Sequence, residues 1–139
     1  MKILIADDEK EIRKIIRRLL ESRGHTVVEA ADGEEAVWHI SDDADVDLCI
    51  MDIMMPRMSG LEAVARIREF SPVPVLFLTA KSMDADKEAA YGNGGDDYLV
   101  KPFAAPELIM KVDALLFFPI LNTGLITRIS ALRLKTTSV

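Results

Sequence analysis

The sequence has few of the residues that disulfide-linked, membrane-spanning or nucleic-acid-binding proteins need. Its 139 residues include one cysteine, Cys49, which excludes an internal disulfide and fits a buried core residue of a reduced, cytoplasmic protein. Lys and Arg number 17 against 23 Asp and Glu, for a net charge of −6, so we expect no direct binding of nucleic acid. The apolar runs are too short for a membrane helix or a signal peptide, so we expect no membrane association.

Half of the residues are apolar, and short apolar runs alternate with amphipathic segments. The runs predict five strands, and segments with apolar residues at i, i+3 and i+4 predict five helices. This alternation is typical of an α/β fold with a doubly wound parallel sheet. The expected strands cover residues 2–6, 26–30, 46–52, 73–80 and 97–101, and the expected helices cover residues 9–24, 33–41, 60–70, 84–92 and 105–117.

Two local signals refine these helices. Asp32 directly precedes the second helix and is expected to be its N-cap residue. The fourth helix is followed by a stretch rich in Gly and Asn, so we expect it to be short, because glycine lowers helix propensity.

Polar residues stand at the carboxyl ends of four expected strands. The carboxyl ends of parallel strands meet at one edge of the sheet, where such folds bind ligands. We therefore expect these residues to form one site. They are Asp7 and Asp8 after the first strand, Asp52 in the third, Thr79 and Ala80 in the fourth, and Lys101 in the fifth.

The residue types indicate phosphoryl chemistry. Three adjacent carboxylates repel one another, and Mg²⁺, which prefers oxygen ligands, would relieve this repulsion. Together with Lys101 the charges then cancel, and the site can accept a phosphoryl group. A carboxylate is a competent nucleophile toward phosphorus and forms an aspartyl phosphate. The Thr79 hydroxyl and the Ala80 backbone N–H are expected to hydrogen-bond the phosphoryl oxygens.

Four stretches of the chain closely resemble the receiver domain of bacterial two-component response regulators: ILIADDE, IMDIMMPRMSG, VLFLTAK and DDYLVKPF. The resemblance covers about residues 1–118 and is greatest to the subfamily with winged-helix DNA-binding domains. It implies a flavodoxin-like fold, with strand order 2-1-3-4-5 and helices on both faces of the sheet.

The same resemblance implies a role for each site residue. Asp52 is the phosphoacceptor, and the donor is the phosphohistidine of a sensor histidine kinase. Asp8, Asp52 and the backbone carbonyl of Met54 ligate Mg²⁺, while Asp7 acts on the metal mainly through water. Lys101 pairs with the phosphoryl group. The chain is then a signalling switch that modifies only itself, and not an enzyme with a separate substrate.

The resemblance also implies how the signal leaves the site. Thr79 and Tyr98 form a coupled switch pair, although Tyr98 also fits an ordinary half-buried strand residue. The dimer surface that it implies consists of Lys87, Asp97, Glu107 and Lys111. In the implied homodimer, Lys87 would meet Glu107 of a partner copy and Asp97 would meet Lys111 of that copy. Such a dimer would control transcription in the full-length regulator. Ordinary solvated charges remain an alternative, and Asp113 departs from the basic residue usual in that subfamily.

Residues 119–139 form an apolar, mildly basic segment without a recognisable output domain. An apolar stripe predicts a helix that packs on this domain or on a partner chain; it consists of Leu121, Leu125, Ile129 and Leu132. A disordered remainder of a truncated or shifted reading frame is the other interpretation. A receiver-like interaction module without phosphorylation is the alternative function. An aspartyl-phosphate phosphatase is disfavoured, because Met54 stands where such enzymes carry an acid–base Asp.

Overall fold

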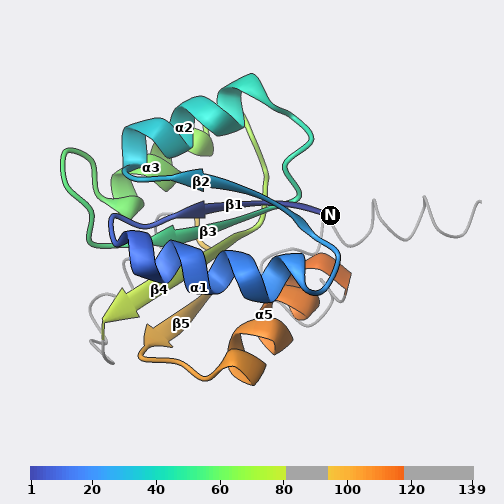
Figure 1. Cartoon of the computed structure of the whole chain (residues 1–139). Helices are drawn as coiled ribbons and strands as arrows, with labels where there is room; N and C mark the ends of the chain where they lie inside the picture. Colours follow the sequence, from blue (N-terminus) through green and yellow to red (C-terminus); the bar gives the residue numbers. More distant parts are fainter. Residues whose placement is uncertain (81–93, 118–139) are drawn as a thin grey trace, which may run out of the picture.

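The computed structural model describes residues 1–80 and 94–117 of the chain. Five parallel strands form one sheet in the order β2-β1-β3-β4-β5 (Figure 1), which confirms the predicted strand order. The strands are β1 (Lys2–Ala6), β2 (Thr26–Ala30), β3 (Leu48–Asp52), β4 (Val75–Ala80) and β5 (Asp97–Lys101).

The strands at the centre of the sheet are apolar because helices cover both of their faces. All five residues of β3 are buried, as are the last four of β1 and the first five of β4. The edge strands β2 and β5 mix polar and apolar residues and are only partly buried. This is the pattern expected of a parallel sheet within two helical layers.

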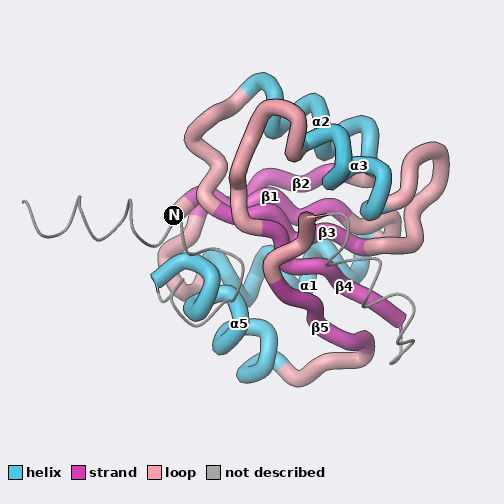
Figure 2. Tube along the Cα trace, turned by 180° about the vertical axis from the view of Figure 1, so that it is seen from behind, coloured by secondary structure: helices cyan, strands magenta, loops and turns pink. Residues whose placement is uncertain are grey.

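The helices of the described residues cover both faces of the sheet (Figures 1 and 2). One face packs against α1 (Lys10–Glu21) and α5 (Ala105–Phe117), and the other packs against α2 (Gly33–Asp42) and α3 (Gly60–Ile67). Within the described residues, no helix is long and apolar enough to cross a membrane.

Several predicted boundaries differ from the observed ones by a few residues. Helix α1 ends at Glu21 and α3 ends at Ile67, where the sequence pattern predicted ends at residues 24 and 70. In both cases the chain continues in short turns: the Gly24 N–H donates to the Glu21 carbonyl and the Phe70 N–H donates to the Ile67 carbonyl, both at 3.0 Å. The residues that the pattern placed at the helix ends therefore lie just past the last full helical turn. The strand predicted over 73–80 begins at Val75, after Pro74, which lacks a backbone N–H.

Side chains cap the helices that flank the third strand. The Glu35 backbone N–H donates to Asp32 Oδ1 at 2.9 Å, which confirms the predicted N-cap of α2. The Glu62 backbone N–H donates to Ser59 Oγ at 3.2 Å at the start of α3. The predicted fourth helix, with Lys87, and the predicted helix within 119–139 lie outside the described residues.

Candidate functional site

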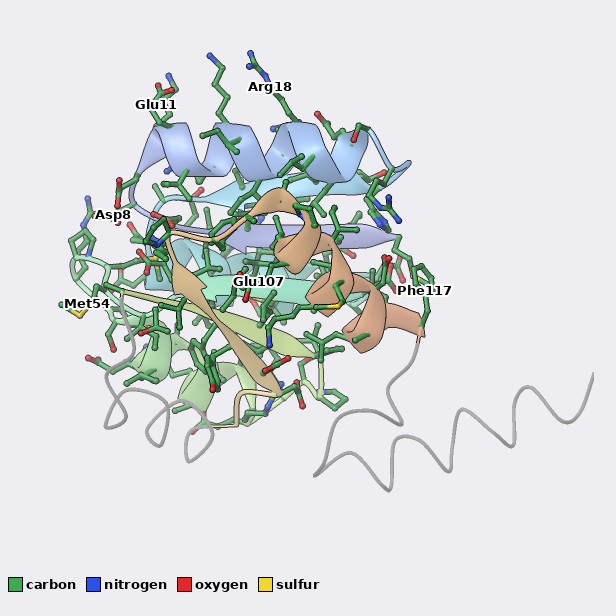
Figure 3. The ribbon with its side chains drawn as sticks, turned by 90° about the horizontal axis from the view of Figure 1, so that it is seen from below. Asp8, Glu11, Arg18, Met54, Glu107 and Phe117 are labelled. Atoms are coloured by element: carbon green, nitrogen blue, oxygen red, sulfur yellow. The ribbon has the colours of Figure 1, made fainter. Side chains whose placement is uncertain are left out.

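The three predicted acidic residues come together at one edge of the sheet. Carboxylate oxygens of Asp7, Asp8 and Asp52 lie within 4.8 Å of one another. Asp7 and Asp52 are 0% and 4% exposed, whereas Asp8 is exposed. In Figure 3, Asp8 and Met54 lie at this same edge of the molecule. The cluster is therefore open to solvent on the side of Asp8 and closed on the side of the sheet.

Lys101 bridges two of these carboxylates. Its Nζ donates to Asp7 Oδ2 at 2.9 Å and lies 3.4 Å from Asp52 Oδ2. Burial alone would lower the pKa of Lys101, but the hydrogen bond to Asp7 and the charge of Asp52 outweigh it and raise that pKa. The ammonium group therefore stays charged between the carboxylates.

Asp52 is the carboxyl group whose ionisation the fold opposes. Burial, followed by the negative charge of Asp7, raises its pKa to about 6. Lys101 and the backbone N–H of Met54 act in the opposite direction and only partly compensate. A cation bound among the carboxylates would favour the ionised, nucleophilic form of Asp52.

Gly60 lets the chain after β3 fold back against Asp52. Its backbone N–H donates to the Ile53 carbonyl at 2.9 Å. A Cβ atom at position 60 would lie 2.1 Å from the Asp52 backbone oxygen. Glycine is thus required here for a close approach, and the turn holds the backbone of Asp52 in place.

Thr79 brings a hydroxyl group to the same edge of the sheet. It is 1% exposed and lies one residue beyond Leu78, the partner of Asp52 in the β3–β4 register. Within the part of the chain that the structure describes, Thr79 Oγ1 has no hydrogen-bond partner. A buried hydroxyl without a partner is costly, so Thr79 is a candidate to donate to a group bound at this edge. Ala80 follows it, exposed, at the end of β4.

Tyr98 is half-buried in β5, opposite Phe77 of β4. Its ring packs against the apolar cluster on the α2–α3 face, and Lys111 Nζ lies 5.6 Å from the ring centroid. These contacts fit an ordinary strand aromatic as well as one member of a switch pair with Thr79.

The predicted dimer surface is only partly described. Asp97 and Lys111 form an ion pair within the chain, with Oδ2 and Nζ 3.1 Å apart. Glu107 is exposed on α5 (Figure 3), and Lys87 lies outside the described residues. An exchange of Lys111 between copies, as the sequence predicted, would therefore replace a pair that already exists.

One residue near the acidic cluster was not predicted from the sequence. Arg13 of α1 donates from Nη1 to the backbone carbonyl of Asp7 at 2.6 Å. Other basic residues precede and follow it along the same helix. No local signal distinguishes Arg13 from these exposed basic residues of α1.

The sequence of this chain is similar to those of known proteins. The family model described as the response regulator receiver domain matches residues 3–113. The transcriptional regulatory protein YvrH of Bacillus subtilis is 47% identical over 113 residues, which are 81% of this chain and 47% of YvrH. CpxR of Escherichia coli, also a transcriptional regulatory protein, is 38% identical over 115 residues, 83% of this chain and 49% of CpxR. The chain thus spans about half the length of these curated relatives.

Solved structures share the same fold. The Francisella response regulator 1452 receiver domain is 35% identical with a TM-score of 0.77, and the match covers 83% of this chain and 95% of that one. The response regulator TrrA from Thermotoga maritima, solved in complex with Mg²⁺ and BeF, is 36% identical with a TM-score of 0.75. That match covers 83% of this chain and 98% of TrrA.

Proposed function

The chain belongs to the response regulator receiver family, and on this basis we propose that Asp52 accepts a phosphoryl group from the phosphohistidine of a sensor histidine kinase. The observation that carries the proposal is the meeting of Asp7, Asp8 and Asp52 within 4.8 Å, with Lys101 2.9 and 3.4 Å from two of them. No single strand supplies this set, and its charges suit a site that holds a cation and a phosphoryl group together.

The donor set fits Mg²⁺. All three side chains offer hard oxygen ligands, one of them on the solvent side. Burial, followed by the charge of Asp7, raises the pKa of Asp52, and a nearby cation would offset both effects by favouring the ionised form. Asp8, Asp52 and the Met54 backbone carbonyl would hold the ion, with Asp7 acting mainly through water. When bound, Mg²⁺ supplies positive charge beside the phosphoryl oxygens. The Mg²⁺–BeF complex of the relative TrrA supports this assignment.

The side chains of this protein then divide the work of the transfer. A carboxylate oxygen of Asp52 forms the bond to phosphorus as the phosphorus–nitrogen bond of the donor breaks, and the electron pair stays on the departing imidazole. Lys101 offsets the negative charge of the phosphoryl group. The Thr79 hydroxyl and the Ala80 backbone N–H donate hydrogen bonds to its oxygens, which would provide the partner that Thr79 Oγ1 otherwise needs.

The output of this switch belongs to the full-length regulator. Movement of Thr79 toward the phosphoryl group would let the Tyr98 ring turn inward and change the surface around β5 and α5. That surface, with Lys87, Glu107 and the Asp97–Lys111 pair, would form a homodimer that controls transcription. We assign residues 1–118 to the cytoplasmic receiver domain and leave 119–139 as a separate segment.

Chemical phosphorylation tests the central claim. The protein is incubated with Mg²⁺ and acetyl phosphate and its intact mass is measured, followed by peptide mapping. We expect one phosphoryl group per chain, on Asp52, and none in Asp52→Asn. Asp45→Asn removes an exposed carboxylate and is the matched control, which should still be labelled. A label that is absent from the wild type, or that persists in Asp52→Asn, would refute the assignment.

The oligomeric state of the protein tests whether phosphorylation controls dimerisation. The molecular mass of the protein in solution is measured with Mg²⁺, with and without beryllofluoride as a phosphate mimic. A dimer that forms only with the mimic and is weakened by Glu107→Lys supports the proposed surface. A constant dimer would assign assembly to the segment after Pro119 instead. Dimerisation and partner binding that are unchanged in Asp52→Ala would support the non-phosphorylated interaction module.

A further inference from the structure

Arg13 connects three segments of the chain next to the acidic cluster. Its Nη1 donates to the Asp7 carbonyl at 2.6 Å, and its Nε donates to Glu29 Oε1 at 3.0 Å. Arg13 belongs to α1, Asp7 to the turn after β1, and Glu29 to β2. The arginine side chain is only 14% exposed. A single guanidinium group therefore ties the loop that carries Asp7 and Asp8 to a helix and to a neighbouring strand.

The bond to the Asp7 carbonyl fixes the direction in which the chain reaches Asp8. That carbonyl belongs to the planar peptide group between the two residues, so holding it orients the whole unit. The other groups of Asp7 are also held: its N–H donates to the Ala30 carbonyl at 3.1 Å, and its Oδ1 accepts from the Glu9 N–H at 2.9 Å. Asp8 is exposed, so its position depends on the loop that carries it rather than on packing against its neighbours.

Glu29 holds Arg13 in place from the far side. It accepts from Arg13 through one oxygen and from Arg17 Nη1 through the other, at 2.6 Å. Burial would raise the pKa of Glu29, but the hydrogen bonds from Arg17 and Arg13 outweigh it and lower that pKa. Arg17 is 41% exposed, so the inner Arg13–Glu29 pair is less screened by solvent than the outer one.

We propose that Arg13, oriented by Glu29, is a positioning residue for the divalent-cation site formed by Asp7, Asp8 and Asp52. The inference rests on the proposed function and adds a residue that touches neither the ion nor the phosphoryl group. Groups that orient metal ligands in this way commonly contribute a factor of about 10 to 100 to metal affinity.

The experiment compares Mg²⁺ binding in variants of the full chain. The Mg²⁺ dissociation constant is measured by calorimetry, and the rate of phosphorylation by acetyl phosphate is measured as a function of Mg²⁺ concentration. Arg13→Ala should raise the dissociation constant and the half-saturating Mg²⁺ concentration about tenfold, with a smaller change in the rate at saturating Mg²⁺. Arg13→Lys should restore part of the affinity, because an ammonium group can donate to the carbonyl but does not reproduce the planar fork.

Two controls separate positioning from general stability. Ile40→Val removes one buried methylene from the α2–α3 face, and should lower stability without changing Mg²⁺ affinity. Arg17→Gln leaves the Arg13 contacts in place and should change affinity little. Glu29→Gln weakens the support of Arg13 and should raise the dissociation constant, so it tests the inference even if Arg13→Ala fails to fold.

The possible failures are distinguishable. A wild-type protein that neither binds Mg²⁺ nor becomes phosphorylated overturns the proposed function, and this inference with it. A wild type that does both, with unchanged Mg²⁺ affinity in folded Arg13→Ala and in Glu29→Gln, overturns only the role of Arg13. If Ile40→Val and Arg13→Ala lose the same stability and the same Mg²⁺ affinity, the effect of Arg13 is one of general stability. That result also overturns the role of Arg13.

Discussion

At the scale of single residues, Asp52 sets a pH dependence on the stability of the metal-free protein. Its pKa rises from about 3.8 to about 6 on folding, because of burial and the charge of Asp7. The folded state therefore holds this proton to a higher pH than the unfolded chain does. The resulting stabilisation is full below pH 3.8 and is lost as the pH rises through about 6.

We therefore expect Asp52→Asn to be more stable than the wild type at pH 7.5 without Mg²⁺, by about 1–3 kcal/mol. The difference should shrink at pH 4.5, where the wild-type carboxyl group is protonated in the folded state. Urea unfolding of both proteins at the two pH values measures this difference in the free energy of unfolding. The same difference at pH 7.5 and at pH 4.5 would show that the ionisation of Asp52 does not oppose folding.

Gly60 is the residue at which the backbone geometry is most restrictive. We expect Gly60→Ala to cost about 2 kcal/mol or more of unfolding free energy and to impair phosphorylation, because its Cβ would meet the Asp52 carbonyl. Gly24→Ala is the control: its Cβ has no neighbour within 4 Å, but its φ is +89°. This control should cost about 1 kcal/mol through backbone strain alone and leave phosphorylation intact. Equal phosphorylation rates in the two variants would contradict the role of Gly60.

At the scale of elements, α2 depends on its N-cap. Asp32 accepts from the Glu35 N–H, and Arg57 Nη1 lies 3.6 Å from its other oxygen. The Arg57 side chain is 72% exposed, so the ion pair should contribute little and the cap most of the effect.

We expect Asp32→Ala to lower the free energy of unfolding by about 1 kcal/mol. Asp32→Asn, which keeps a capping oxygen and removes the charge, should change it by only a few tenths of that amount. Denaturant unfolding of the two variants separates the contributions. A loss in Asp32→Asn as large as in Asp32→Ala would assign the effect to the ion pair with Arg57.

Boundaries and connections are also decided at this scale. The apolar runs of β1, β3 and β4 predicted their strands well, because residues buried on both faces leave a continuous signal. The helix ends were predicted less well, since Gly24 and Phe70, which the pattern placed at the ends of two helices, lie in short turns after Glu21 and Ile67.

At the scale of the whole molecule, a bound ion should stabilise the folded state, because only the folded chain brings the three carboxylates together. Mg²⁺ at about 100 times its dissociation constant should add about 2.7 kcal/mol and raise the melting temperature. Asp8→Asn should lose most of this gain. Thermal unfolding with Mg²⁺, against a monovalent salt at matched ionic strength, measures it. If Mg²⁺ raised the melting temperature of the wild type and of Asp8→Asn equally, the ion would bind at another site.

The order of residues along the chain is enough to predict the alternation of strands and helices, the parallel sheet and the residues of the acidic site. Those features depend on local apolar periodicity and on which residue ends each strand, and both are visible in the sequence. The meeting of Asp7, Asp8, Asp52 and Lys101 follows from that pattern, because parallel strands bring their carboxyl ends to one edge of the sheet.

The side chains that support that site become identifiable only in the folded molecule. Arg13 reaches Asp7 and Glu29, yet nothing near Arg13 in the sequence distinguishes it from the other basic residues of α1. The sequence predicted that Asp97 would meet Lys111 of a partner copy, whereas in the structure the two pair within one chain. The raised pKa of Asp52 likewise arises from burial and from Asp7, 45 residues away. Long side chains choose among many partners, and that choice depends on distances and burial that exist only once the helices pack on the sheet.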